Sequence, residues 1–339
     1  ENSVFKIAFE GDIRESAEEN PFTNLLTGRE PDLSLRDLLK SIRHAKEQES
    51  VKGIYLDMGV FSGGTARRAL MDFKESGKFI VAYADNYTQG GYYLASVADK
   101  IYLNPQGILG LTGLSSRTMF YKGLLQKIGV EMMVFKVGTY KGAVEPFIAD
   151  KLSDANREQI TSYQNSIWGN ITKGIAKSRN ITVADEGAFF ASPEKAVEYK
   201  LIDELKYRSE VEKYLIEQSG QTGDKLKTVG LSNMKNVKKT EREYRNKIAI
   251  VYAEGEIMQQ IISSPYSGNF PCISEKINDD LRKLADNKDV KAVVLRINSP
   301  GGSAYTSEQI WKQVYELKKK KPVVVSMGSV AASGGYYIA

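Results

Sequence analysis

The chain has 339 residues, of which 42% are hydrophobic and 26% charged, and a net charge of +5 from 47 basic and 42 acidic side chains. This length allows two domains, each with its own core, and the composition is typical of globular proteins. The small net charge, without a basic helix or an aromatic and basic platform, does not favour nucleic acid as a partner. The single cysteine, Cys272, excludes an intrachain disulfide and a cysteine-cluster metal site.

Strands and helices alternate through the first part of the chain. Apolar, β-branched runs predict strands, and the segments between them have the length and apolar spacing of helices. This alternation indicates βαβ crossovers and a mostly parallel sheet. One or two long helices are predicted over Ser153–Asn180, and the Ser-Pro pair at Ser192 predicts another helix start. The alternating segments are the strand 53–58, the helix 66–77, the strand 79–85, the helix 90–98 and the strand 100–105.

The single histidine, His44, lies in a predicted amphipathic helix in which Leu35, Leu38 and Ile42 share one face. At 100° per residue, position 44 falls about 180° from Leu35, which predicts a solvated histidine on the polar face. A Ser-His-Asp triad within the chain is therefore not expected, and a histidine-rich metal site is excluded. A nucleophile in this chain needs a different base.

Two stretches of the chain resemble two earlier stretches, in the same order and with the same offset. "TQGGYYLA" (88–95) matches "ASGGYYIA" (332–339), and the Glu-Gly pair at Glu10 matches the pair at Glu254. Matches so far apart predict a duplicated domain rather than a solenoid repeat. We expect a first repeat over 1–210, a polar, lysine-rich linker or extension over 211–245, and the N-terminal part of a truncated second repeat over 246–339.

The ends of two predicted strands in the second repeat are rich in glycine, in "INSPGGSA" (297–304) and "GSVAASGGYY" (328–337). Parallel α/β sheets place their sites at the carboxyl ends of strands. Glycines there let backbone N–H groups approach a ligand oxygen, as an oxyanion hole requires. Ser333, at a predicted helix start, is thus a candidate nucleophile, although tight βα turns alone also explain the glycines. The first repeat has Gln89 in place of Ser333, so one copy keeps the hydroxyl and the other does not.

A serine without a histidine needs a lysine or a carboxylate as its base. A lysine acts as a base where burial lowers its pKa, and most lysines here lie in polar runs. "VFKVGTYKGAVEPF" (134–147) differs, because Lys141 lies between glycines and among apolar residues. Lys141 is therefore the first candidate and Lys136 the second.

The motifs "GTYKGAVEPF", "RINSPGGS" and "MGSVAASGGYYIA", together with the duplication, resemble the long, two-copy form of the S49 serine peptidases of the ClpP/crotonase superfamily. The resemblance implies an α/β fold of tandem ClpP/crotonase-like βαβ domains with long helices. It implies a Ser/Lys dyad in which Ser333 is the nucleophile and Lys141 the general base. The N–H groups of Gly302 and Gly334 would form the oxyanion hole, and Gly301 would shape the turn.

The same resemblance implies an enzyme that digests cleaved signal peptides without a cofactor or a metal. It implies a homo-oligomer, expected to be a tetramer, on the periplasmic side of the bacterial cytoplasmic membrane. The sequence contains no apolar run long enough to span a bilayer, so the family's N-terminal anchor is expected upstream of Glu1. Because the second repeat stops at Ala339, we expect this chain alone to bring the Ser333 and Lys141 side chains together poorly.

Two other functions fit parts of the pattern. A crotonase-type enzyme would use the glycine-rich oxyanion hole for acyl-CoA thioesters, with a carboxylate base such as Glu145, but the sequence offers no clear CoA-binding signature. A non-catalytic, ring-forming scaffold would tolerate two degenerate repeats, and Gln89 shows that one repeat already lacks the serine. The expected partners are peptide substrates, further copies of the chain and a membrane, and not nucleic acid.

Overall fold

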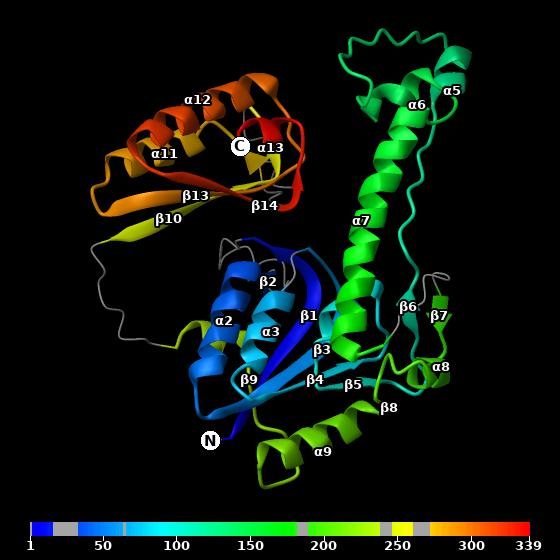
Figure 1. Cartoon of the computed structure of the whole chain (residues 1–339), viewed down its shortest axis with the longest axis vertical. Coiled ribbons are helices and arrows are strands. Elements are labelled where there is room, and N and C mark those ends of the chain that lie inside the picture. The colour runs from blue at the N-terminus through cyan, green and yellow to red at the C-terminus, as the bar shows by residue number, and fades with distance from the viewer. Residues whose placement is uncertain (1, 16–32, 64–65, 182–188, 238–245, 260–271) are drawn as a thin grey trace. The chain divides into compact units, whose positions relative to one another are not determined.

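The computed structural model describes residues 2–15, 33–63, 66–181, 189–237, 246–259 and 272–339 (Figure 1). The described chain folds into two compact units. Within these residues, no helix combines the length and the apolar composition that crossing a membrane requires. Unit 1 comprises Glu1–Phe9, Lys52–Val60 and Gly77–Thr228, and unit 2 comprises Glu10–Val51, Phe61–Ser76 and Val229–Ala339.

The first part of the chain forms a sheet with the strand order β2-β1-β3-β4-β5-β8, and β9 pairs with β1. β3, β4 and β5 are parallel neighbours. β4 is buried along nearly its whole length, as expected of a parallel strand covered on both faces. The predicted alternation of strands and helices is confirmed. The elements are β1 (Ser3–Arg14), β2 (Leu33–Ser34), α2 (Leu35–Glu47), β3 (Val51–Gly63), α3 (Arg67–Lys74), β4 (Phe79–Ala84), α4 (Gln89–Ala95), β5 (Lys100–Leu103), β8 (Glu204–Leu205) and β9 (Thr228–Val229).

Unit 1 carries one long helix, α7 (Asp154–Arg179). The sequence predicted one or two long helices over 153–180, and the structure has one. Ser153 caps its first turn by accepting a hydrogen bond from the Asn156 N–H at 3.2 Å, and Asn180 ends it in the left-handed region. Two short helices, α5 and α6, lie at the N-terminal end of α7 (Figure 1). The remaining elements of this unit include β6 (Leu109–Leu111), α5 (Lys122–Lys127), α6 (Glu145–Ile148), β7 (Phe189–Ala191) and α8 (Pro193–Glu198).

The described part of the predicted linker or extension, residues 211–237, contains helical segments, and the linker assignment itself stays a prediction. α9 (Arg208–Ser219) packs Val211 and Leu215 into a core cluster with Val81 and Tyr102 of the sheet. Apolar residues four positions apart give this helix one apolar side despite its charges. α10 (Leu231–Lys235) follows β9, and residues 238–245 lie outside the described residues.

His44 is buried, at 5% exposed, and is not the solvated side chain that its helical position predicted. α2 places Leu35, Leu38 and Ile42 on its buried face as expected. A second surface of α2 packs against α10, where the His44 Nδ1 lies 2.8 Å from its hydrogen-bond partner, the Met234 carbonyl oxygen. The prediction was wrong because the spacing of apolar residues within one helix does not reveal a second partner helix.

A second parallel sheet, β10-β13-β14, forms the C-terminal part of unit 2. Leu295 and Ile297 of β13 are fully buried beneath α11 and α12, which pack side by side (Figure 1). The lysine run at 318–321 ends α12 as predicted, and Lys321 Nζ donates a hydrogen bond to the Leu284 oxygen at 2.5 Å. The elements are β10 (Lys247–Glu254), β11 (Glu256–Ile257), β12 (Cys272–Ile273), α11 (Ile277–Asp286), β13 (Val290–Ser299), α12 (Ala304–Lys320), β14 (Val323–Ala331) and α13 (Gly334–Tyr337).

The parallel sheets with intervening helices confirm the predicted α/β class. The two matching octapeptides, 88–95 and 332–339, each form a short helix directly after a parallel strand, namely α4 after β4 and α13 after β14. This likeness is what a duplication would produce. The duplication and the domain boundaries stay predictions.

Candidate active site

Ser333 lies at the turn between β14 and α13. The strand ends at Ala331 and the helix begins at Gly334, so Ser333 is the N-cap residue. Its backbone has φ 50° and ψ −122°, a strained conformation that costs an L-residue about 1–3 kcal/mol. The side chain is exposed and makes no capping hydrogen bond. A strained strand-to-helix turn that presents an uncommitted hydroxyl is typical of a nucleophile elbow.

Two glycine N–H groups near this turn, those of Gly302 and Gly334, have no acceptor among the described residues. Gly334 is the first residue of α13, where an N–H has no partner within the helix. Gly302 lies beside Ile257. The Ile257 N–H donates to the Gly301 oxygen at 2.9 Å, and the Ser303 N–H donates to the Ile257 oxygen at 2.8 Å. These bonds fix the loop on both sides of Gly302 and leave the Gly302 N–H available to a ligand oxygen.

Gly301 brings the "SPGG" turn against the Ser333 turn. A Cβ placed on Gly301 would lie 2.6 Å from the Gly334 nitrogen and 2.8 Å from the Ser333 Cβ, so the two turns are in contact. With φ 97°, Gly301 also has a conformation that L side chains rarely adopt. The structure therefore brings together four of the predicted site residues in unit 2, namely Ser333, Gly301, Gly302 and Gly334. Their chemical roles stay predictions.

Ser299 is a residue of this site that the sequence analysis missed. It is fully buried, and its Oγ donates to the Gly255 oxygen at 2.6 Å and accepts the Gly301 N–H at 3.1 Å. Its backbone oxygen accepts the Ala332 N–H at 3.0 Å. One residue thus ties together three loops around Ser333. The one signal in the sequence was its position directly before the Pro-Gly-Gly turn. That position does not reveal its hydrogen-bond partners, so the residue was missed.

Lys141 belongs to unit 1, whereas Ser333 belongs to unit 2. It lies between α5 and α6, as the N-cap residue of the 3-10 turn η1 (Gly142–Val144). Its side chain is exposed within unit 1, and so is that of Lys136. Val137, one of the apolar residues near Lys141 in the sequence, is itself 91% exposed. The predicted burial of Lys141 is therefore wrong for unit 1 by itself, and its pairing with Ser333 stays a prediction.

Glu145, the carboxylate considered as the base of an acyl-CoA enzyme, is committed to hydrogen bonds. It is 4% exposed and accepts from the Ser153 Oγ at 2.5 Å, the Ser153 N–H at 3.1 Å and the Asn156 Nδ2 at 3.0 Å. These donors, the Ser153 hydroxyl first, hold the pKa of the Glu145 carboxyl below its ordinary value. A carboxylate stabilised in this way is a poor proton acceptor, which disfavours Glu145 as a general base.

The lowered pKa of Glu145 predicts that acid loosens its contacts with α7. A carboxyl whose pKa is lower in the folded state stabilises the fold fully above its unfolded pKa, about 4.3 for glutamate. This stabilisation is lost as the pH falls through the folded pKa. Hydrogen exchange of the amides in 142–156 should therefore speed up below about pH 4 relative to the rest of α7. Glu145→Gln should abolish that acid step, and a step that persists in this variant would belong to another group.

Gln89 occupies the position in "TQGGYYLA" that Ser333 has in "ASGGYYIA". Its Oε1 accepts the Gly113 N–H at 2.8 Å, so the side chain is committed to a loop. Thr88 caps α4 from an ordinary extended conformation. Of the two matching turns, the one at Ser333 alone has a non-glycine residue with positive φ. A surface pocket of about 380 Å³ beside Gln89 is lined by residues 86–89, 108, 110 and 112.

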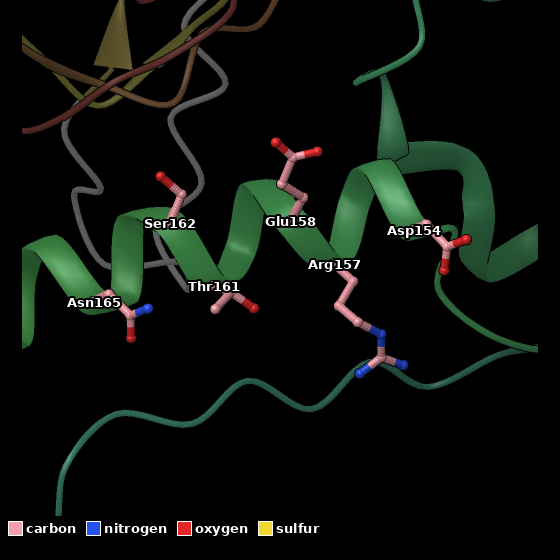
Figure 2. Close-up of a pocket in the computed structure, with 6 residues that line it drawn as sticks. All are labelled: Asp154, Arg157, Glu158, Thr161, Ser162 and Asn165. Atoms are coloured by element: carbon pink, nitrogen blue, oxygen red, sulfur yellow. The ribbon is translucent and has the colours of Figure 1, made fainter.

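A second surface pocket, of about 450 Å³, runs along the first turns of α7 (Figure 2). Its walls are polar and charged side chains from one helix, and no predicted site residue is among them. Within the described ranges, no cluster of His, Cys, Asp and Glu side chains could hold a metal ion. The pocket is lined by Asp154, Arg157, Glu158, Thr161, Ser162 and Asn165.

Comparisons with known proteins agree with the motifs. The family model "Peptidase family S49" matches residues 72–222, and the model "Clp protease" matches residues 259–339. The chain is 37% identical over 324 residues to "Protease 4" of Salmonella typhi and 35% identical over 329 residues to "Protease 4" of Haemophilus influenzae. It is 33% identical over 322 residues to "Serine protease SPPA, chloroplastic" of Arabidopsis thaliana.

These alignments cover 90%, 90% and 91% of this chain but 52%, 53% and 47% of the relatives. The chain therefore spans about half the length of the curated relatives it matches. Residues 72–222 are thus similar to the S49 peptidases and residues 259–339 to the Clp proteases. The family recognised from the three motifs is thus confirmed.

Proposed function

We propose that this chain is part of a signal peptide peptidase A, or protease IV, that hydrolyses peptide bonds through a dyad of Ser333 and Lys141. The observation that carries the proposal is the strained Ser333 turn, beside which the described residues leave the Gly302 and Gly334 N–H groups without acceptors. Acyl transfer requires such a hydroxyl together with convergent N–H donors. The three relatives whose names are those of proteases support it.

The proposed reaction is acyl transfer through a covalent intermediate. Neutral Lys141 removes the Ser333 proton while the Oγ attacks the peptide carbonyl carbon. The carbonyl oxygen becomes an oxyanion that accepts hydrogen bonds from the Gly302 and Gly334 N–H groups. Lys141 then passes its proton to the leaving amine as the peptide C–N bond breaks. In the second half, Lys141 takes a proton from a water molecule that attacks the acyl carbon. The same proton moves from Lys141 to the Ser333 Oγ as the bond between the Oγ and the acyl group breaks, which restores the starting state.

Lys141 has to be neutral for this reaction, whereas an ordinary lysine has a pKa of about 10.4. Removal from water lowers the pKa of a lysine, because the charged form loses its hydration. Lys141 is exposed within unit 1. The proposal therefore requires the complete site to cover Lys141 when it meets Ser333.

We propose that the substrates are cleaved signal peptides and other unfolded peptides. Ser333 directly follows β14, which has a neighbour on one side in the described sheet. An extended peptide can add to such a strand edge. The family resemblance further supports a bacterial protein at the cytoplasmic membrane, with an N-terminal anchor and its catalytic part on the periplasmic side.

We propose that the full-length protein is a homo-oligomer, a tetramer by family resemblance. The arm that carries Lys141 (residues 113–148) exposes several large apolar side chains, for which a second copy of the chain is the proposed partner. Native mass spectrometry of the full-length protein would count the copies. The exposed side chains include Met119, Leu124, Ile128, Met133, Phe135 and Val137.

Fluorophosphonate labelling of the full-length protein tests the proposed function. A serine peptidase should be modified at Ser333, as mapped by mass spectrometry, and lose the label in Lys141→Met. Binding of acyl-CoA without labelling would support the crotonase alternative instead. If the protein is not labelled and does not bind acyl-CoA, the non-catalytic scaffold is supported. Either outcome without labelling would refute the peptidase.

Gly301→Ala is expected to lower kcat/KM for peptide hydrolysis by the full-length protein about 100- to 1,000-fold. The added methyl group would overlap the Gly334 nitrogen and displace an oxyanion donor. Gly169→Ala, on α7, is the matched control because a Cβ there meets nothing within 4 Å. A fluorogenic peptide assay measures both variants. Wild-type kinetics in Gly301→Ala would contradict the proposed oxyanion hole.

A further inference from the structure

We propose that Glu145 is a positioning residue. Its carboxylate fastens the loop that carries Lys141 to the N-terminal end of α7. This inference rests on the proposed function, in which Lys141 is the general base. Glu145 itself does not touch the reacting atoms in this account. It acts through the backbone on which Lys141 stands.

Among the described residues, the side-chain hydrogen bonds of Glu145 go to the start of α7. Both of its oxygens accept hydrogen bonds from Ser153, and one also accepts from the Asn156 Nδ2. The Ser153 Oγ in turn accepts the Asn156 N–H at 3.2 Å as the helix cap. The same hydroxyl therefore caps the helix and binds the carboxylate. A negative charge at this position is also favoured by the helix dipole.

The backbone next to Lys141 is held on both sides. A Cβ on Gly142 would overlap the Asn156 side chain, so the residue after Lys141 lies directly against Asn156. On the other side, the Tyr140 hydroxyl donates to Glu158 Oε2 at 3.3 Å, and Figure 2 shows Glu158 one turn into α7. The Lys141 side chain is exposed between these two anchors. A backbone held in place is one of the two requirements of a pre-positioned base, and the other is a side chain fixed by its surroundings in the complete site.

The charge of Glu145 is needed as well as its shape. Both carboxylate oxygens accept, whereas the amide group of a glutamine would turn one acceptor into a donor. The Ser153 hydroxyl bonds one of these oxygens, and the Ser153 N–H and the Asn156 Nδ2 bond the other. The new donor would therefore face either that hydroxyl or those two donors, and the loss of charge weakens the bonds that remain. Glu145→Gln should thus loosen the loop from α7 with little change in volume. Misplacing a catalytic group by about 1 Å costs about 100-fold in rate.

The test compares Glu145→Gln with Glu131→Gln in the full-length protein. Glu131 is an exposed carboxylate on the same arm for which the described residues show no hydrogen bond or ion pair, so the control removes the same charge without the contacts. We expect Glu145→Gln to lower kcat about 100-fold with little change in KM. The rate of Ser333 modification by a fluorophosphonate should fall by a similar factor. Glu131→Gln should match the wild type in both measurements.

A double-mutant cycle separates positioning from a merely structural role. If Glu145 acts through Lys141, adding Glu145→Gln to Lys141→Met should cause no further loss in the residual kcat for peptide hydrolysis. A loss of the same size in both backgrounds, or a folded Glu145→Gln with the wild-type rate, would overturn the inference. If Glu145→Gln fails to fold, Asn156→Ala decides, with an expected loss that also disappears in the Lys141→Met background.

The two proposals fail in different ways. Lys141→Met with the wild-type rate of Ser333 modification would refute the proposed base. Loss of modification in Lys141→Met together with a wild-type rate in Glu145→Gln would refute the positioning role alone.

Discussion

Replacing Ser333 with alanine is expected to lower kcat for peptide hydrolysis by the full-length protein about 10⁴- to 10⁶-fold. The substitution removes the oxygen that forms the acyl-enzyme and leaves the oxyanion donors in place, so the residual rate reflects binding and electrostatics alone. The side chain is exposed and makes no capping bond, so its loss should not unfold the protein. Steady-state kinetics and thermal unfolding of the same preparation measure both effects.

Ser333→Gly sharpens this prediction. Glycine adopts positive φ without the Cβ penalty, so relief of the strain at φ 50° should make this variant at least as stable as Ser333→Ala, while it stays inactive. A gain in stability with a loss of activity is the mark of strain kept for function. Hydrolysis by Ser333→Ala above one per cent of the wild-type kcat would show that Ser333 is not the nucleophile.

Replacing Lys141 with methionine is expected to lower kcat about 10³- to 10⁶-fold and to abolish fluorophosphonate labelling of Ser333. Methionine keeps much of the length and the apolar stem of lysine but has no amine that could take the serine proton. A triad enzyme loses nearly as much rate without its base as without its nucleophile, because the two act as a unit. The comparison is kcat of the variant against the wild type, with the same peptide.

Lys136→Met is the matched control for Lys141→Met. It removes an exposed lysine from the same arm, five residues earlier in the chain, and should keep the wild-type kcat. The reverse outcome, an inactive Lys136→Met and an active Lys141→Met, would transfer the role of base to the second candidate. Activity in both variants would exclude the lysine mechanism.

The features that could be predicted from the sequence depend on neighbours along the chain. The strands and helices followed from apolar spacing, α7 from its polar but uninterrupted helical run, and the α8 start from its Ser-Pro pair. The contact between the Gly301 and Ser333 turns was foreseeable because both lie at the carboxyl ends of adjacent parallel strands.

The features that could not be predicted depend on partners distant in the sequence. His44 is buried because α10 covers a second side of its helix. Ser299 joins three loops through hydrogen bonds that no local pattern encodes. Lys141 lies among apolar residues in the sequence, yet the arm that carries it presents them to solvent within unit 1. Burial is decided by what packs against a segment, and the sequence of that segment alone does not specify its partner.

The measurement that tests the central claim most directly is a structure of the full-length protein with a peptide inhibitor bound covalently to Ser333. We expect one Lys141 Nζ within about 2.6–3.2 Å of the Ser333 Oγ. The inhibitor's carbonyl oxygen should lie about 2.7–3.1 Å from the Gly302 and Gly334 nitrogens. A structure in which every Lys141 Nζ lies beyond hydrogen-bond reach of every Ser333, directly or through one water, would contradict the account.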